Sequence, residues 1–547
     1  MPGKPGLSWL QVLMVLAAGC AQAASMAWPF VYELGLGLAF GQPVWWLQPL
    51  SLLLLVWQLE QASTVRQGVW LGWLFATAMQ SATWWWLFIS LHTYGGLASP
   101  LAVLAIVGLA GFLALYYAAV CGVFVALART GRAWFALVFA CLWLLAELGR
   151  VEIFTGFPWG EGGYAQLDGP FADLAKLVGV HGLTFFAALL AAALVGVLRR
   201  PRWLNSAVLA GGVLVLAGAS GSLHLDKTGV SAFTQPYPPA SSGASPFTVA
   251  LLQGNIAQDE KFLGGSGIPD ALKWYGEQLR DARTSLIVTP ETALPLLPGQ
   301  LPEGYLDALV QRFLQPPANS PPTAALVGIP LGSSEDGYTN SVIGLKPAPL
   351  DAAGQPVGSI RDNIYRYDKH HLVPFGEFVH PLFKWFLAVV DIPLSDFNRG
   401  AVSQPNFDWQ GQRLAPNICY EDLFGEELAA RFTDAAQAPT MFVNISNIAW
   451  FGNSIAIDQH LAISRMRAIE FERPMIRATN TGATVIIDHR GVVTHSLQRH
   501  TRGILVGEVQ GRSGITPYAW WVSRFGLWPL WALALAVVGL AFVRSRR

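Results

Sequence analysis

The stretch Leu414-Ala415-Pro416-Asn417-Ile418-Cys419-Tyr420-Glu421-Asp422 ends an apolar run at a cysteine, and two acids follow within three residues. This pattern predicts a buried strand that ends at Cys419 and turns into a helix over residues 423–430. A thiol at the start of a helix lies where backbone N–H groups and the helix dipole favour thiolate over thiol. The stretch therefore predicts a reactive cysteine at a strand end.

The other cysteines of the chain leave Cys419 without a partner for a disulfide. Cys20, Cys121 and Cys141 all lie in long apolar runs, so Cys419 is the only thiol in the polar part of the sequence. A lone cysteine is also compatible with a buried structural side chain, which is the plainer interpretation. Other residues must decide between the two.

The composition indicates a membrane protein. Of the 547 residues, 53% are hydrophobic and only 13% are charged, whereas an ordinary soluble domain has about 25% charged residues. Residues 1–245 contain 18 of the 70 charged side chains, so the zero net charge covers an apolar N-terminal half and a normally charged C-terminal half.

Eight apolar segments are predicted to span the membrane. Residues 69–91 and 101–127 carry no charge and are long enough to cross ~30 Å of hydrocarbon. The others are residues 7–26, interpreted as an uncleaved first span, a second span that ends near residue 59, and residues 134–146, 177–198, 203–223 and 525–543. Basic residues occur at the N-terminus, after every second span and at the C-terminus, which predicts two cytoplasmic ends: Lys4, Arg66, Arg129, Arg132, Arg199, Arg200, Arg202, Arg544, Arg546 and Arg547.

The segment between the last two spans is therefore predicted to lie outside. Residues 230–246 are rich in Ser, Pro, Gly and Ala and indicate a linker. Short β-branched runs then alternate with helical stretches, which predicts an α/β domain. The runs are residues 248–253, 285–289, 324–329, 340–345, 414–419, 440–445, 475–478, 484–487 and 504–509. We expect a membrane domain over 1–229, the linker over 230–246, the α/β domain over 247–510 and a final helix and tail over 511–547.

Some classes of function are disfavoured by what the sequence lacks. It has no repeat, no cysteine and histidine cluster of the metal-binding type, no glycine-rich phosphate loop and no basic aromatic stripe for nucleic acid. We therefore expect no cofactor, no metal ion and no nucleic-acid partner.

Two further polar clusters follow predicted strands, and strand ends are where sites assemble in open α/β sheets. One contains Glu291 after Pro290, and the other runs from Asp368 through Lys369, His370 and His371 to Glu377. A carboxylate can take a thiol proton, and an ammonium can stabilise an oxyanion. Singly, Glu291 is also compatible with an acid at a helix start, and Lys369 with a surface lysine paired to Glu377. A Cys–His dyad or a metal site at the two histidines is disfavoured, since no second ligand pair is in view.

Taken together, these clusters resemble a known family. Glu291, Lys369 and Cys419 occur in the order of the Glu-Lys-Cys triad of the nitrilase, or carbon–nitrogen hydrolase, superfamily. Several longer motifs are similar to the apolipoprotein N-acyltransferase family within it, and this resemblance covers nearly the whole chain. They are Thr155-Gly156-Phe157-Pro158-Trp159, Gln253-Gly254-Asn255-Ile256, His371 to Phe378, Ile418 to Glu421, Ala449-Trp450-Phe451-Gly452 and Met466-Arg467-Ala468.

The resemblance implies an αββα nitrilase-like domain on the outer face of the bacterial inner membrane. It implies that Cys419 is the nucleophile, Glu291 the general base and Lys369 the oxyanion stabiliser. Glu377, Tyr420 and Glu421 match supporting residues of the family, and Trp450 and Phe451 match its acyl-binding region.

The implied reaction is a ping-pong acyl transfer from a membrane glycerophospholipid, by way of a cysteine thioester, to the α-amine of a diacylglyceryl-cysteine at a lipoprotein N-terminus. Two alternatives remain open at this point. One is a membrane-tethered amidase of the nitrilase type, and the other is a membrane scaffold without catalysis.

Overall fold

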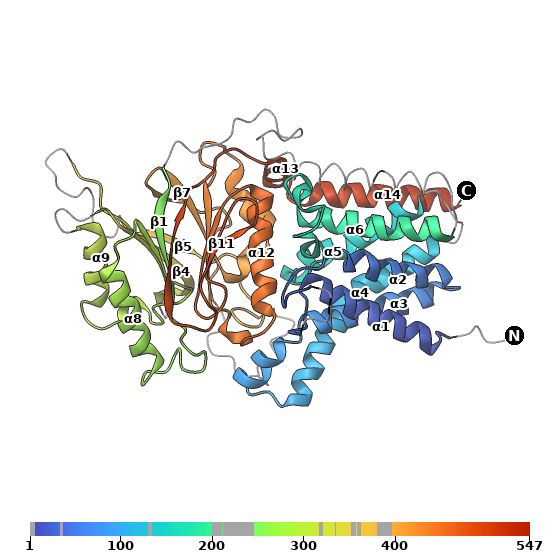
Figure 1. Cartoon of the computed structure of the whole chain (residues 1–547), viewed down its shortest axis with the longest axis horizontal. Helices are drawn as coiled ribbons and strands as arrows, with labels where there is room; N and C mark the ends of the chain where they lie inside the picture. The colour runs from blue at the N-terminus through green and yellow to red at the C-terminus, as the bar shows by residue number, and fades with distance from the viewer. Residues whose placement is uncertain are drawn as a thin grey trace.

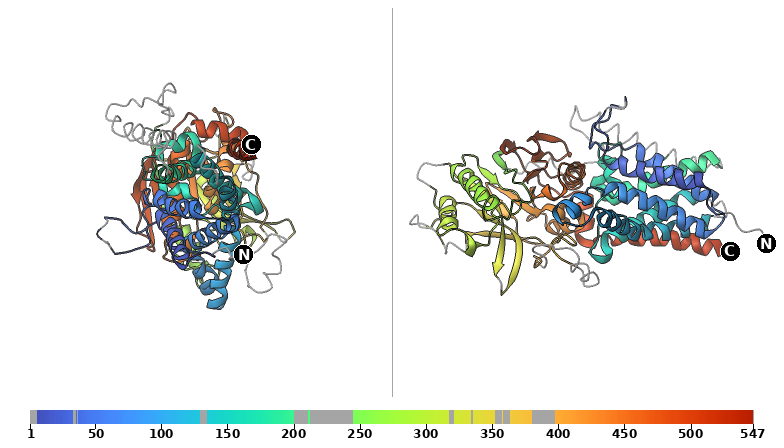
Figure 2. Two further views of the ribbon diagram at one scale, coloured as in Figure 1. Left: turned by 90° about the vertical axis from the view of Figure 1, so that its right-hand side faces the viewer. Right: turned by 90° about the horizontal axis from the view of Figure 1, so that it is seen from below.

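The protein folds into a bundle of long helices and a β-sandwich, which lie end to end (Figure 1). The view from below in Figure 2 shows the same arrangement. This computed structural model describes residues 6–32, 35, 37–128, 134–199, 211, 245–316, 321–333, 335–351, 357, 363–379 and 397–546. Most of the predicted span at 203–223, most of the predicted linker at 230–246 and the loop residues Arg129, Arg132, Arg200 and Arg202 lie outside the described residues.

Seven long helices form the described part of the bundle. They are α1 (Trp9–Met26), α2 (Leu47–Gln61), α3 (Val65–Thr83), α4 (Ser99–Ala128), α5 (Phe135–Glu152), α6 (Ala175–Arg199) and α14 (Trp528–Arg546). The first begins after Ser8, whose hydroxyl accepts the N–H of Gln11 at 3.2 Å and caps the helix. Figure 1 shows that α1 begins and α14 ends at the end of the bundle away from the sandwich.

Four of the described helices are long and apolar enough to cross a membrane. They are Trp9–Met26, Ser99–Leu127, Ala172–Arg199 and Trp528–Arg546. Each coincides with a predicted span, at residues 7–26, 101–127, 177–198 and 525–543. These four predictions are confirmed as helices of suitable length and composition.

The predicted span at residues 69–91 is wrong beyond residue 83. The helix α3 ends at Thr83, and a turn leads to a short π-helix, η1 (Ile89–Tyr94). The indole N–H of Trp86, in that turn, donates to the side chain of Gln459 at 3.0 Å. The chain therefore leaves the helix where Trp86 finds a partner in the sandwich, and hydropathy does not reveal this.

The sandwich contains two six-stranded sheets. The first has the order β12-β1-β2-β3-β4-β5 and the second the order β11-β10-β9-β8-β7-β6. The strands are β1 (Phe247–Gln253), β2 (Leu286–Val288), β3 (Ala324–Ser333), β4 (Gly337–Leu345), β5 (Tyr365–Asp368), β6 (Phe407–Trp409), β7 (Gln412–Ile418), β8 (Met441–Ser446), β9 (Met475–Thr479), β10 (Val485–Ile487), β11 (Val493–Ser496) and β12 (Gly503–Val509). All nine predicted runs form strands, whereas β6 and β11 were not predicted because they are short strands at a sheet edge.

The two sheets pack face to face, and helices cover both outer faces. Apolar side chains from both sheets form the core between them, among them Val249, Val288, Ile418 and Val443. Helices α8 (Gly267–Asp281) and α9 (Tyr305–Leu314) cover the first sheet. Helix α12 (Ala456–Phe471) covers the second sheet and lies between it and the bundle (Figure 1). This confirms the αββα arrangement that the resemblance implies.

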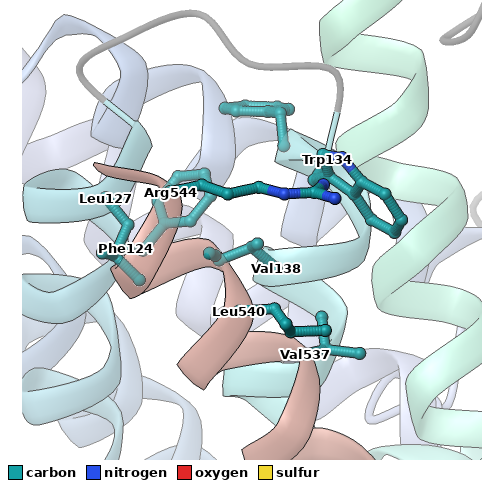
Figure 3. Close-up of a pocket in the computed structure, with 9 residues that line it drawn as sticks. Phe124, Leu127, Trp134, Val138, Val537, Leu540 and Arg544 are labelled. Atoms are coloured by element: carbon teal, nitrogen blue, oxygen red, sulfur yellow. The ribbon is translucent and has the colours of Figure 1, made fainter. Parts of the chain in front are cut away.

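A small apolar pocket lies at the end of the bundle away from the sandwich, between α4, α5 and α14 (Figure 3). Its volume is about 70 Å³. The guanidinium of Arg544 lies 5.1 Å from the ring centroid of Trp134, a pairing typical of a helix end at a membrane surface. None of the predicted site residues lines this pocket, so the chemistry has to be sought in the sandwich.

Candidate active site

Cys419 follows directly after β7 and begins the 3-10 helix η8 (Cys419–Leu423). Its φ is +53°, in the left-handed region that residues with a Cβ rarely adopt. Such strained residues gather at functional sites, where surrounding contacts hold them. The side chain is partly exposed, so the structure places a strained and accessible cysteine at the end of a central strand.

The helix predicted over residues 423–430 has a different form. It is divided into η8, the five-residue helix α11 (Gly425–Ala429) and the 3-10 helix η9 (Ala430–Phe432). Helices this short offer little dipole, and burial raises the pKa of the Cys419 thiol well above its usual value, with the charge of Glu291 adding to the rise. The prediction that the helix start favours the thiolate is therefore wrong, and a resting thiol at this site needs a base.

Glu291 and Lys369 lie together after strand ends of the first sheet. Glu291 follows β2 and Lys369 follows β5, and the ammonium lies 3.2 Å from a carboxylate oxygen of Glu291. The second carboxylate oxygen accepts the backbone N–H of Asn447, which follows β8 of the other sheet, at 2.8 Å. Both side chains are buried. The two sheets thus meet at this carboxylate, and the predicted pair is brought together.

The charges around Glu291 and Lys369 keep the carboxyl ionised and the amine protonated. Burial by itself would raise the pKa of the Glu291 carboxyl, but Lys369 and Lys261 hold it below its ordinary value. Burial would likewise lower the pKa of the Lys369 ammonium, but Glu291 and Glu377 hold it above its ordinary value. Both charges act on the Cys419 thiol. The site therefore presents a neutral thiol, an ionised carboxylate that can accept its proton, and an ammonium.

Glu377 is the second carboxylate bound to Lys369. One of its oxygens lies 2.9 Å from the ammonium and accepts the side-chain amide of Asn340 at 2.8 Å. Its other oxygen accepts the N–H of Val373 at 2.9 Å, which closes the loop that carries it. The same amide of Asn340 donates to Glu291 at 2.8 Å. Glu377 therefore supports the lysine, and Asn340 joins the two carboxylates.

Glu421 connects the strand of Cys419 with the strand of Lys369. Its carboxylate accepts four hydrogen bonds, from the backbone N–H groups of Ile418, His370 and His371 and from the hydroxyl of Tyr367. Three of the four are between 2.6 and 2.8 Å long. Glu421 therefore positions the ends of β7 and β5 relative to each other.

The two histidines after Lys369 bond to groups other than the thiol. The Nδ1 atom of His371 lies 2.8 Å from a carboxylate oxygen of Glu427, and its ring stacks on Phe424 with centroids 3.5 Å apart. The Nδ1 atom of His370 lies 2.7 Å from the Gly400 carbonyl oxygen. Burial lowers the pKa of His371 to about 4. Within the described ranges, no cluster of three His, Cys, Asp or Glu side chains could hold a metal ion.

The predicted aromatic residues lie on the side of the site that faces the bundle. The Tyr420 hydroxyl donates to the carbonyl of Gly156 at 3.5 Å. The ring of Phe451 lies 4.3 Å from Trp86, and that of Trp450 lies 5.8 Å from Tyr94, between centroids. All three residues therefore contact the loops that connect the bundle helices.

A buried glutamine of α12 holds these loops to the sandwich. Its side-chain oxygen accepts the indole N–H groups of Trp86 and Trp159 at 3.0 and 2.8 Å, and its NH₂ group donates to the Thr83 carbonyl at 3.2 Å. We call Gln459, Trp86, Trp159 and Phe451 the aromatic junction. It places the site against the membrane helices.

Three site residues were not predicted from the sequence. Asn340 and Asn447 were not singled out because they lie in or next to strands with ordinary patterns. Lys261 follows the Gln253 to Ile256 motif, and its ammonium donates to the backbone carbonyl of Glu291 at 3.0 Å while only 3% of the residue is exposed. Burial lowers the pKa of Lys261 to about 8. The position of Lys261 shortly after the Gln253 to Ile256 motif was the one available signal in the sequence.

The chain matches two family descriptions and several curated proteins. Residues 34–193 match the apolipoprotein N-acyltransferase N-terminal domain, and residues 248–518 match carbon-nitrogen hydrolase. A protein of Verminephrobacter eiseniae named apolipoprotein N-acyltransferase is 55% identical over 96% of this chain and 94% of its own length. A protein of the same name from Ralstonia nicotianae is 42% identical over 92% of this chain and 90% of its own length.

Among solved structures, a carbon-nitrogen hydrolase of Helicobacter pylori G27 covers 52% of this chain and 94% of its own, at 15% identity and a TM-score of 0.32. That likeness is too weak to carry an argument, whereas the curated relatives extend over both parts of the molecule at high identity. The chain therefore belongs to the apolipoprotein N-acyltransferase family, membrane-bound enzymes with a carbon–nitrogen hydrolase domain.

Proposed function

We propose that this enzyme moves a fatty acyl chain from a glycerophospholipid, through a thioester on Cys419, to the α-amine of the diacylglyceryl-cysteine of an apolipoprotein. The observation that carries the proposal is the site itself. A partly exposed thiol lies within the electrostatic reach of a buried Glu291 and Lys369 pair, next to the membrane helices. The name of the relatives supports a lipoprotein acceptor and a lipid donor.

In the first half-reaction, the Glu291 carboxylate takes the thiol proton of Cys419 as the sulfur attacks the ester carbonyl of the phospholipid. The ammonium of Lys369 stabilises the negative charge that develops on the carbonyl oxygen. When the tetrahedral intermediate collapses, the carbon–oxygen bond of the ester breaks and Glu291 returns the proton to the departing alkoxide. A lysophospholipid leaves, and the acyl chain stays on sulfur as a thioester.

In the second half-reaction, the neutral α-amine of the acceptor attacks the thioester carbonyl. Glu291 accepts the proton that the amine loses, the carbon–sulfur bond breaks, and the thiol of Cys419 is restored with that proton. The product is an amide, which is more stable than the phospholipid ester that donated the acyl chain. This difference in stability drives the overall transfer. The buried carboxylate and ammonium suit this step because a dry site protects the thioester from water.

The two half-reactions can be separated by supplying one substrate at a time. Phospholipid alone should release lysophospholipid up to about one equivalent of enzyme, because the acyl chain then occupies Cys419. A diacylglyceryl-cysteinyl peptide with a free α-amine should restart release and become N-acylated. The same peptide with an acetylated amine should not, since it has no nucleophilic nitrogen.

Two variants serve as controls for this burst. Cys419→Ala should give no lysophospholipid, whereas Cys20→Ala, which removes an exposed thiol of the bundle, should keep the full burst. Continuous release of lysophospholipid without an amine would show that water takes the acyl group. The protein would then be a hydrolase of the amidase type, and the proposal would be wrong.

We also propose that the chain crosses the bacterial inner membrane eight times, with both ends cytoplasmic and the catalytic domain on the periplasmic face. We propose domain boundaries at residues 1–229, 230–246, 247–510 and 511–547. Two observations support this: four described helices are long and apolar enough to cross a membrane, and α1 begins at the same end of the bundle at which α14 ends (Figure 1).

Thiol labelling tests this topology. In a chain that lacks Cys20 and Cys419, a cysteine in place of exposed Glu303 should react with an impermeant reagent in intact spheroplasts. A cysteine in place of Ser63, in the connection between α2 and α3, should react only after the membrane is opened. Labelling of the Ser63 position from outside would overturn the eight-span arrangement.

A further inference from the structure

A buried polar cluster lies behind Cys419, on the side of the second sheet that α12 covers. It consists of Asp422 in η8, His460 and Ser464 in α12, and Arg477 in β9, and all four residues are fully buried. None of them takes part in the proton transfers described above. Asp422 and Arg477 carry opposite charges, so the cluster is balanced if His460 is neutral.

The hydrogen bonds of His460 define its tautomer. Its Nδ1 atom lies 2.7 Å from a guanidinium nitrogen of Arg477, which can only donate, so Nδ1 accepts and carries no proton. The proton is therefore on Nε2, which lies 3.0 Å from Asp422 and 3.2 Å from the carbonyl oxygen of Cys419. Burial and the charge of Arg477 both lower the pKa of His460, in agreement with a neutral ring.

The remaining contacts of the cluster hold this ring in place. The hydroxyl of Ser464 donates to the second carboxylate oxygen of Asp422 at 2.5 Å, and Arg477 donates to Ser464 and lies 3.4 Å from Asp422. Asp422 therefore has partners on both oxygens and has little freedom to turn away from His460.

The target of the ring is the peptide group that follows the nucleophile. The carbonyl oxygen of Cys419 also accepts the side-chain amide of Asn444 at 3.3 Å, so two side chains bind it from behind. In a trans peptide the N–H points opposite to the C=O. Fixing the Cys419 carbonyl toward the cluster therefore aims the N–H of Tyr420 away from the cluster.

We propose that Asp422, His460 and Arg477 form a positioning network that holds the strained Cys419 turn and directs the Tyr420 N–H at the oxyanion of the tetrahedral intermediate. This inference rests on the proposed acyl transfer. The N–H then complements Lys369, and the two donors bind the same oxygen from different sides. His460 is a positioning residue, because it contacts the backbone of the nucleophile and no reacting atom.

Two reactions of Cys419 separate this role from general support of the fold. Acylation by phospholipid passes through an oxyanion, whereas alkylation by iodoacetamide displaces iodide and forms no oxyanion. His460→Leu removes the donor to the Cys419 carbonyl, and its burst rate with phospholipid should fall about 100-fold, the usual cost of losing one oxyanion donor. Its alkylation rate should stay within about twofold of the native rate.

Conservative variants complete the test. His460→Gln keeps a donor of similar reach and should recover most of the burst rate. Asp422→Asn keeps the volume and removes the charge that accepts the Nε2 proton of His460. It should show the same split between the reactions at about a tenfold loss, even if His460→Leu does not fold. His495→Leu, on exposed β11, is the matched control and should leave both rates unchanged.

An equal fall in burst and alkylation rates would overturn the inference, because the cluster would then act on the thiol or on the whole fold. An unchanged burst in folded His460→Leu would overturn it as well. Failure of the native enzyme to give any burst would instead contradict the proposed function, so the two results are distinguishable.

Discussion

The catalytic cluster of Glu291, Lys369, Glu377 and Asn340 and the aromatic junction are stabilised by opposite means. Around Glu291 and Lys369, buried charges are satisfied by one another and by amide donors. In the aromatic junction, the indoles of Trp86 and Trp159 share a single polar partner, the side chain of Gln459, and the ring of Phe451 packs on Trp86. The difference indicates that the catalytic cluster performs the reaction, whereas the aromatic junction fixes the site against the membrane helices.

A variant in the catalytic cluster should have the largest effect on the acylation rate. Glu291→Gln preserves the shape of the side chain but removes the base that a neutral Cys419 thiol requires, so the phospholipid burst should slow about 10³-fold. Rapid-quench measurement of lysophospholipid gives the rate, and Glu303→Gln on the surface is the matched control. A burst within tenfold of the native rate would mean that another group accepts the thiol proton.

An intermediate effect is expected from the second lysine of the site, and it should depend on pH. Removing the cation Lys261 lets the pKa of Glu291 rise, so the carboxylate becomes protonated, and the base is lost, at a higher pH. Lys261→Met should therefore move the acid limb of the acylation rate to higher pH. The pH profile of the burst measures this shift, and Lys273→Met, at an exposed lysine of α8, should leave it in place. An acid limb that does not move would show that Lys261 has no influence on Glu291.

The smallest effect on acylation should come from the aromatic junction. Gln459→Leu leaves two buried indole N–H groups without an acceptor, at about 1–3 kcal/mol each. The thermal unfolding midpoint should fall by about 5 °C, while the burst rate of the folded protein stays within about twofold. Gln437→Leu on the surface is the control. A burst that falls as far as in Glu291→Gln would erase the distinction between the two regions.

Residues at strand ends could be predicted from the sequence, whereas residues inside regular elements could not. Glu291, Lys369 and Cys419 each follow a predicted strand, and polar or reactive residues at strand ends can be recognised without a structure. The α/β class followed from the alternation of short strands and helices, and the resemblance to the family implied the αββα layers. His460 and Arg477 were missed because each is a single polar residue inside a regular element, and only the fold brings them to the Cys419 carbonyl.

In the bundle, by contrast, the sequence predicted a helix that is longer than the one in the structure. Residues 69–91 are uncharged and contain no proline, so hydropathy predicts one continuous helix there. The helix ends at Thr83 because the indoles of Trp84 and Trp86 bond to the Trp159 carbonyl and to Gln459. Tryptophan in an apolar run looks the same whether it faces lipid or another domain, so the junction could not be predicted from composition.

The acyl-enzyme on Cys419 is the central claim, and intact-protein mass spectrometry tests it most directly. After incubation with a phospholipid of one defined acyl chain and no acceptor, the native enzyme should gain the mass of a single acyl group. Peptide mapping should place that group on Cys419, hydroxylamine should remove it as expected of a thioester, and Cys419→Ala should gain nothing. Native enzyme that transfers acyl chains to the acceptor peptide while never carrying one, or an adduct that persists in Cys419→Ala, would contradict the account.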